Sequence, residues 1–270
     1  MKRVRTVPRL PRRGRAAHKG DCGTVLAVAG SAGMLGAAIL CATAALRGGA
    51  GLVQVALPAA LRSLLPLAQP CATTVLRSPA ALRVAVRGAD AVVVGPGLGA
   101  TAATRALVQA VLRDRAVPVV LDADALNVLA PLRRPFGDGA GLVLTPHPGE
   151  AARLLGTTAA AVQADRPAAL RELCARSGAI VVLKGAGTLV GDGRQCFTNR
   201  TGNPGLATGG TGDVLAGLLG ALLAQGMAPF EAACLAVQVH GKAGDRMALR
   251  YSEPGLLASD LPAAIAEELR

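Results

Sequence analysis

The sequence predicts an α/β fold with a mainly parallel sheet, and three observations support this. Short apolar runs alternate with longer helical patterns along the chain. Some runs, such as AVVV at residues 91–94, are apolar throughout, as expected of a parallel strand buried on both faces. The 270 residues are 51% hydrophobic and 17% charged, which suits one large domain with a full core. Because no linker or internal repeat divides the chain, we expect a single domain.

Strands are predicted where apolar runs end in glycine, proline or acidic residues. They lie at 24–29, 52–57, 91–94, 117–121, 142–145 and 179–183, with a strand or loop at 70–76. The runs 188–190 and 195–198 predict a hairpin, because Gly191-Asp192-Gly193 between them supplies turn residues.

Helices are predicted at 35–47, 58–67, 102–112, 167–177, 230–249 and 258–269. The first is rich in alanine and is closed by Gly48-Gly49, and the last is capped by Ser259 and Asp260.

The net charge of +12 is concentrated at the N-terminus, where eight of the 29 basic residues precede Asp21, the first acid. RNA binding by this basic tail is one hypothesis, and a targeting segment is another. With one Tyr, three Phe and no Trp, the chain lacks the aromatic platforms of single-strand binders. We therefore predict no nucleic-acid partner. The tail has no apolar segment of the secretory type, which argues against secretion.

The six cysteines are scattered, with no C-x-x-C and no histidine at metal-ligand spacing. We interpret them as small buried hydrophobes in a reducing compartment, the cytoplasm. Residues 22–46 carry no charge and are long enough to span a bilayer. Gly30-Ser31-Ala32-Gly33 divides them into a strand and a helix, so we predict core and no membrane contact.

Residues 203–225 hold the strongest functional signal. The glycine-rich run Gly209–Asp213 precedes a helical stripe of Leu215, Leu218, Leu219, Leu222 and Leu223, which Gly226 ends. A glycine loop before a helix presents free N–H groups at the positive end of the helix dipole, so it predicts an anion site. No Gly-Lys-Ser/Thr follows, which excludes a Walker A loop. Alternatively, Asp213 only caps the helix.

This stretch carries a family resemblance. GGTGD followed by a Leu/Ala/Gly helix resembles the anion-hole segment of the ribokinase-like superfamily. The longer string NPGLATGGTGDVLAG resembles the ADP-dependent NAD(P)H-hydrate dehydratases. The resemblance spans residues 17–269 and implies a three-layer αβα sandwich at 18–270, preceded by a basic tail at 1–17. No epimerase-like segment, a common fusion in this family, precedes it, so we expect the dehydratase domain alone.

The resemblance also implies an activity: ADP-dependent dehydration of (6S)-NADHX and NADPHX to NADH and NADPH, giving AMP and phosphate, by a homotetramer with Mg²⁺. Asp213 would be the catalytic base and would contact substrate, with Gly210, Thr211 and Gly212 as the anion hole. If Asp213 is not the base, Asp122 or Asp124 is next. The alternative activity is a small-molecule kinase of the same superfamily.

The segment GPGLGA at 95–100 fits two interpretations. It matches the Rossmann fingerprint G-x-G-x-x-G/A, with Asp122 ending the next strand. Pro96, however, removes an N–H that would face the pyrophosphate, and a Rossmann site leaves GGTGD unexplained. The family resemblance instead places Gly97 and Gly99, with Ala37, at the substrate.

Two further loops follow predicted strands, where ligands of open α/β sheets bind. In TPHPGE the resemblance places His147 at the substrate and gives Glu150 a role at Mg²⁺, through water. In the second loop it places ADP on Lys184, Gly185, Ala186, Gly187 and Thr188, and on Gly212. From the residues themselves, the lysine offers charge and the glycines offer backbone donors to phosphates.

Overall fold

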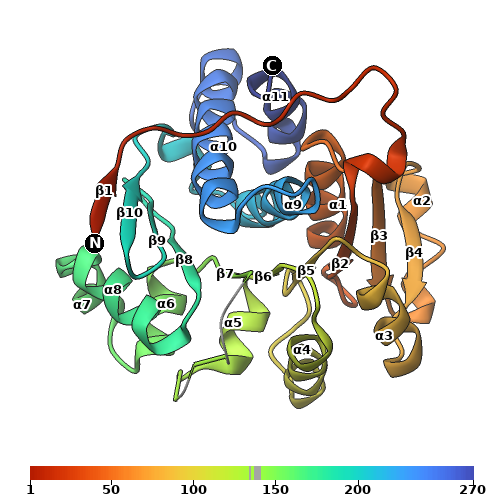
Figure 1. Cartoon of the computed structure of the whole chain (residues 1–270), viewed down its shortest axis with the longest axis horizontal. Helices are drawn as coiled ribbons and strands as arrows, with labels where there is room; N and C mark the ends of the chain where they lie inside the picture. The colour runs from red at the N-terminus through yellow and green to blue at the C-terminus, as the bar shows by residue number, and fades with distance from the viewer. Residues whose placement is uncertain (134, 137–140) are drawn as a thin grey trace.

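The computed structural model describes residues 1–133, 135–136 and 141–270 and contains one ten-stranded sheet (Figure 1). The strand order is β1-β10-β9-β8-β7-β6-β5-β2-β3-β4, and all neighbours from β8 to β4 are parallel. The strands are β1 Lys2–Val4, β2 Thr24–Val28, β3 Leu52–Leu57, β4 Thr73–Leu76, β5 Ala91–Val94, β6 Val119–Leu121, β7 Leu142–Leu144, β8 Ile180–Leu183, β9 Leu189–Gly191 and β10 Gln195–Thr198.

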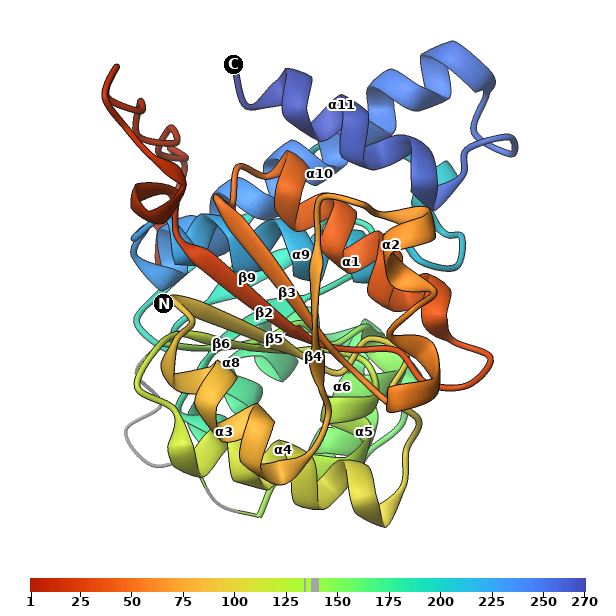
Figure 2. The ribbon, with the colours of Figure 1, turned by 90° about the vertical axis from the view of Figure 1, so that its right-hand side faces the viewer.

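Helices cover both faces of the sheet, which confirms the predicted three-layer sandwich (Figures 1 and 2). One face carries α1 Leu35–Arg47, α9 Thr211–Ala224, α10 Pro229–Tyr251 and α11 Leu261–Glu268. The other carries α3 Pro79–Arg87, α4 Ala102–Asp114, α5 Asp124–Leu129, α6 Pro148–Leu155, α7 Ala159–Ala164 and α8 Arg166–Ser177, and the short α2 Leu65–Ala68 lies near β4. Short 3-10 turns occupy Lys19–Cys22, Ala59–Leu61, Pro204–Leu206 and Ala258–Asp260.

Successive side chains along the central strands point to opposite faces of the sheet and so contribute to two separate cores. Val25 and Val93 point into the core under α1 and α9, whereas Leu26 and Val92 point into the core under α3 to α8. Small residues let α9 approach closely. A side chain at Gly217 would meet the backbone of Cys41 in α1, and one at Gly220 would meet Val93 in β5. These two glycines therefore serve packing.

Several elements differ from the sequence prediction. The predicted helix at 58–67 is a 3-10 turn followed by the four-residue α2. Helices α3, α5, α6 and α7 were not predicted, because each has nine residues or fewer and the periodic pattern is too short to stand out. The predicted 258–269 helix begins as a 3-10 turn at Ala258–Asp260.

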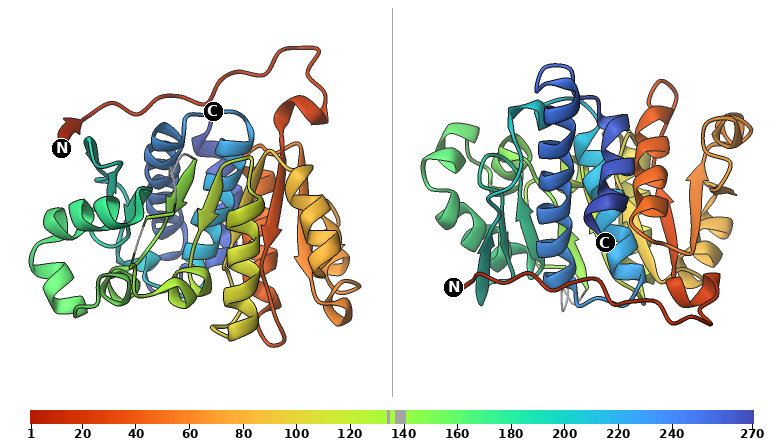
Figure 3. Two further views of the ribbon diagram at one scale, coloured as in Figure 1. Left: turned by 60° about the horizontal axis from the view of Figure 1, so that its bottom comes forward. Right: turned by 90° about the horizontal axis from the view of Figure 1, so that it is seen from above.

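The basic N-terminal segment packs onto the domain. Its β1 pairs in parallel with β10, and Val7 lines a small cleft with Phe230 and Cys234 of α10. Arg13 donates a hydrogen bond to the carbonyl of Gly49, near the C-terminal end of α9. Figure 3 shows the path of this N-terminal segment along one end of the domain. The segment therefore lies at the opposite end of α9 from the glycine loop, about 20 Å away for a 14-residue helix.

Four of the six cysteines are buried, as predicted, but Cys71 is exposed and Cys196 is half-buried. Residues 24–47 form β2, a turn and α1, as predicted from Gly30–Gly33. Among the described residues, no helix is both long enough and apolar enough to span a bilayer.

Candidate active site

The glycine loop forms an open helix N-terminus. Gly210 is the N-cap of α9 with φ 95°, a left-handed conformation that favours glycine. The first bond of the helix runs from the N–H of Val214 to the carbonyl of Gly210 at 3.1 Å. The N–H groups of Thr211, Gly212 and Asp213 precede it and make no backbone hydrogen bond within the described part of the chain. They are available to an anion.

Two side chains fix this N-terminus. The hydroxyl of Thr211 donates to the carbonyls of Leu206 and Thr208, at 2.9 and 3.1 Å. The backbone carbonyl of Thr211 lies 3.0 Å from Nε2 of buried His240 in α10. Burial lowers the pKa of His240 to about 4, so the ring is neutral and donates here. Nothing in the sequence around His240 had signalled this contact.

Asp213 is the third residue of α9 and is not its cap. The N-cap is Gly210, and no side-chain capping bond forms there. Burial, followed by the charge of Asp122, raises the pKa of Asp213 to about 7, against the opposing effect of Lys184. A carboxyl group with a pKa near neutrality suits proton transfer at physiological pH.

Lys184 is the cation beside this helix end. Its Nζ lies 2.8 Å from Oδ1 of Asp122, which also accepts from the hydroxyl of Thr145 at 2.6 Å. Asp122 is 1% exposed and the lysine side chain 19%. Burial alone would lower the pKa of Lys184. The charges of Asp122 and Glu150 outweigh this effect, so the pKa is raised. A side-chain carbon at Gly212 would lie 3.4 Å from Nζ, so the lysine faces the glycine loop.

His147 and Glu150 form a capping box at the start of α6. Nδ1 of His147 accepts from the N–H of Gly149 at 3.0 Å, and Oε2 of Glu150 accepts from the N–H of His147 at 2.8 Å. Burial, then Lys184 and Arg153, lowers the pKa of His147, which keeps it neutral. Burial raises the pKa of Glu150, whose Oε2 lies 3.9 Å from Lys184. Both residues thus have a structural role at the start of α6.

The GPGLG loop brings Gly97 to Ala37. A side-chain carbon at Gly97, where φ is 61°, would lie 2.9 Å from Cβ of Ala37. The N–H of Gly99 donates to Oδ2 of Asp124 at 2.7 Å, and its carbonyl accepts from the hydroxyl of Thr104 at 2.6 Å. Asp124 therefore holds this loop.

The two glycines of the loop after β8 adopt left-handed backbone conformations that favour glycine. Gly185 and Gly187 have φ of 128° and 64°, and the hydroxyl of Thr188 donates to the carbonyl of Gly185 at 2.9 Å. Arg166 supports the strand end by donating to the carbonyls of Leu183 and Lys184, at 3.0 and 3.2 Å. Ala186 is exposed. Arg166 belongs to no motif, and Thr145 opens TPHPGE but was assigned no role, so the sequence did not indicate either contact.

Eight of the predicted residues form two neighbouring groups. Asp213, Gly212, Lys184 and Glu150 gather around Asp122, and His147 adjoins them through Glu150. Ala37, Gly97 and Gly99 form the second group, with Met34 between them. Asp122 and Asp124, two residues apart, connect the groups.

Comparison with known proteins identifies the family of this chain. Residues 25–267 match the model of a family described as NAD(P)H-hydrate dehydratase. The chain is 46% identical over 257 residues to the ADP-dependent (S)-NAD(P)H-hydrate dehydratase of Neisseria meningitidis, covering 92% of this chain and 85% of that one. It is 44% identical over 266 residues to the bifunctional NAD(P)H-hydrate repair enzyme Nnr of Moorella thermoacetica, covering 93% of this chain but 50% of that one. The chain thus spans about half the length of the bifunctional relatives.

Solved structures support the same family assignment. A ribokinase-like superfamily protein from Enterococcus faecalis superposes with a TM-score of 0.88 at 28% identity, covering 96% of this chain and 91% of that one. The ADP/ATP-dependent NAD(P)H-hydrate dehydratase of Bacillus subtilis, co-crystallised with ATP and Mg²⁺, superposes with a TM-score of 0.87 at 32% identity, covering 98% of each chain. The chain belongs to the NAD(P)H-hydrate dehydratase family, within the ribokinase-like superfamily.

Proposed function

We propose that this protein catalyses the ADP-dependent dehydration of (6S)-NADHX and NADPHX to NADH and NADPH, with release of AMP and phosphate. The observation that carries the proposal is Asp213, a partly buried carboxyl group with a pKa of about 7 in the first turn of α9. It lies beside free backbone N–H groups and a lysine, a combination that suits phosphoryl transfer.

The reaction proceeds in two steps. Asp213 takes the proton of the ring hydroxyl, whose oxygen then attacks the terminal phosphoryl group of ADP, and the bond to AMP breaks. N–H groups of Gly210, Thr211 and Gly212 stabilise the charge that develops. In the second step the ring carbon–oxygen bond breaks and phosphate leaves. The adjacent carbon loses a proton to solvent water, and the new double bond restores the dihydronicotinamide.

The remaining predicted residues hold the two reactants. The segment Lys184–Thr188 and Gly212 bind ADP, and the lysine supplies a positive charge to its phosphates. Ala37, Gly97 and Gly99 bind the hydrated ring, together with His147. Because His147 is neutral, its ring places no cation against the substrate.

The donor set also suits Mg²⁺. Oε2 of Glu150 is bonded to the N–H of His147, whereas Oε1 approaches only Nε2 of His147, at 3.5 Å, among the described residues. No cluster of three metal-ligating side chains forms in the described part of the chain. Glu150 would therefore hold Mg²⁺ through bound water, as Mg²⁺ usually keeps several waters. When bound, the ion neutralises phosphate charge.

The direct test is to incubate the protein with NADH hydrate and ADP and follow the absorbance of reduced nicotinamide. Recovery of the absorbance with release of AMP and phosphate is expected. A small-molecule kinase would consume nucleotide and accumulate a phosphorylated alcohol without recovery of absorbance, and this outcome would contradict the dehydratase.

The pH dependence should follow Asp213. A base must be ionised, so kcat/KM should fall about tenfold per unit below pH 7 and level off above it. Rates measured at saturating ADP between pH 5.5 and pH 8.5, chosen as roughly one and a half units on either side of that pKa, check this. A flat profile would remove Asp213 from proton transfer.

Deleting residues 1–15 should leave catalysis nearly intact. The segment lies at the end of α9 remote from Asp213, so the rate should stay within about threefold. Loss of β1 and of the packing of Val7 should lower the melting temperature. A large loss of kcat in the folded deletion variant would place the segment in the site.

We further propose that the protein acts as a homotetramer in the cytoplasm, following the family. Large apolar side chains such as Leu67, Leu249 and Leu257 are 83%, 91% and 61% exposed, consistent with surfaces that another subunit covers. Light scattering would measure the assembly.

A further inference from the structure

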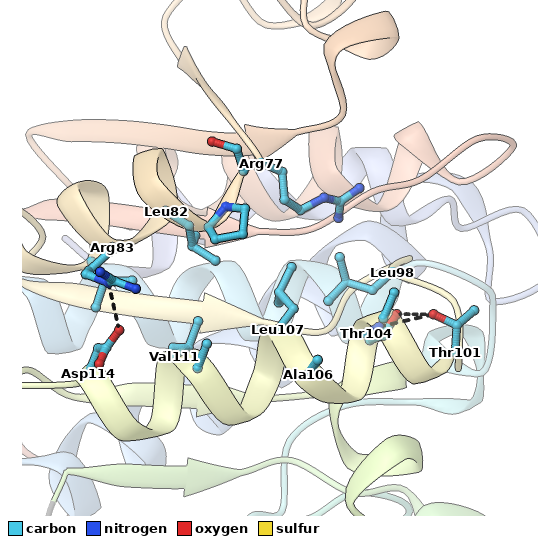
Figure 4. A pocket seen from close by; sticks show the side chains of 15 residues that line it. Arg77, Leu82, Arg83, Leu98, Thr101, Thr104, Ala106, Leu107, Val111 and Asp114 are labelled. Atoms are coloured by element: carbon cyan, nitrogen blue, oxygen red, sulfur yellow. Dashed lines mark hydrogen bonds and ion pairs between the residues drawn. The ribbon is translucent and has the colours of Figure 1, made fainter.

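A pocket of about 540 Å³ lies between α3 and α4, on the sheet face opposite α9 (Figure 4). Its walls are Leu82 and Val86 of α3 and Leu107 and Val111 of α4. A volume of this size with apolar walls is typical of a small-molecule site. None of the residues assigned above to catalysis, ADP or the substrate lines this pocket.

One end of the pocket is built by the substrate loops. Leu98, between Gly97 and Gly99, lines it. Arg77 lines the same end and donates to the carbonyl of Gly30 at 2.8 Å, and the N–H of Gly30 donates to the carbonyl of Pro96 at 2.8 Å. The loop after β5 therefore carries two of the proposed ring-binding residues, Gly97 and Gly99, next to the pocket residue Leu98, and the loop after β2 links it to Arg77 through Gly30.

The two ends of the pocket differ in their charged groups. At the far end Arg83 is paired with Asp114 at 3.5 Å. Arg77 is half-buried, burial lowers its pKa, and no carboxylate within the described residues pairs with it. A partly desolvated guanidinium with spare donors favours an anion, and its planar fork matches the oxygens of a phosphate group. The pocket thus offers a phosphate-binding group, then apolar walls, then a polar pair.

We propose that this pocket binds the adenosine half of the dinucleotide substrate, with Arg77 against its pyrophosphate. The inference rests on the function proposed above. The parts of a dinucleotide follow the same order as these groups. Its reacting ring fits the site beside Asp213, the pyrophosphate comes next, and the flat purine follows. The purine lies between the leucine and valine side chains of α3 and α4, and the Arg83–Asp114 pair offers a donor and an acceptor to its polar edge.

The test fills the pocket without touching the catalytic groups. Ala106 is an exposed residue of α4 that lines the pocket, and Ala102 is an exposed residue of α4 that does not. Ala106→Phe should raise the KM for NADH hydrate about tenfold or more, with kcat and the KM for ADP unchanged. Ala102→Phe is the matched control and should resemble the wild type.

Two measurements complete the test. Arg77→Gln should raise the KM for NADH hydrate in the same way, which covers the case in which Ala106→Phe misfolds. The hydrate of reduced nicotinamide mononucleotide lacks adenosine, so the wild type should use it with a higher KM that Ala106→Phe does not change.

Three outcomes would overturn the proposal: unchanged KM for NADH hydrate in both pocket variants, a rise in the KM for ADP instead, or equal wild-type KM values for the two hydrates. These differ from failure of the proposed function, in which the wild type restores no reduced nicotinamide at all.

Discussion

Asp213→Asn should give a folded protein that binds ADP and whose turnover is lower by about 10²–10⁴, the usual contribution of a general base. Asparagine has nearly the same size but cannot accept the hydroxyl proton. Because Gly210 is the cap of α9, the substitution removes no capping bond. ADP affinity should stay or rise, since a negative charge beside the phosphates is lost. Steady-state turnover and calorimetric ADP binding measure both effects.

Asp165→Asn is the matched control. Asp165 is a true helix cap, with Oδ1 accepting from the N–H of Ala168 at 2.8 Å, and Asn caps about as well as Asp. Its turnover and stability should therefore equal those of the wild type. An Asp213→Asn variant that kept more than about a tenth of wild-type turnover would contradict the assignment of the base. The proton acceptor would then be Asp122 or Asp124.

The same substitution should change stability in a pH-dependent way. The pKa of Asp213 is about 7 in the folded chain against 3.8 for a free side chain. A raised carboxyl pKa means stability that is present at low pH and is lost as the pH rises through the folded value. Because asparagine does not ionise, Asp213→Asn abolishes this loss of stability at higher pH. The variant should match the wild type near pH 4 and melt at a higher temperature above pH 7.

The sequence predicted the central elements well because their signals are local. The helix at 35–47 and the strands at 52–57 and 91–94 have the predicted bounds. Each is a mainly apolar segment that glycine or proline follows. By contrast, β1 was not predicted, since its partner β10 lies about 190 residues away and a basic segment carries no strand pattern. Pairing between distant segments leaves little trace in either segment alone.

The candidate site could likewise be predicted only in part. Glycine loops at strand ends and the start of α9 are local signals, and the structure brings the predicted loops to one edge of the sheet. The contacts that set the charges join distant residues, for example Lys184 to Asp122, 62 positions apart. The sequence indicated a lysine for phosphate but not its buried counter-charge. The pKa of Asp213 depends on both groups and so required the structure.

Lys184→Ala should therefore have two large effects. Loss of a charge-assisted contact should weaken ADP binding about ten- to hundredfold. The structure also predicts a cost in stability. Asp122 is 1% exposed, and removing its partner leaves a buried charge without compensation, which costs about 3–5 kcal/mol of unfolding free energy. Calorimetry and chemical denaturation measure the two effects. Exposed Lys242 in α10 offers a control, since Lys242→Ala should change neither.

A double variant separates binding from stability. Combining Lys184→Met with Asp122→Asn removes both charges, and the amide oxygen can still accept the hydroxyl of Thr145. Because residue 122 no longer carries a buried charge, most of the lost stability should return. ADP affinity should stay low, since the phosphates still lack their cation. Recovery of ADP affinity together with stability would show that Lys184 acts only through the fold, and the cation for the phosphates would then have to be another residue.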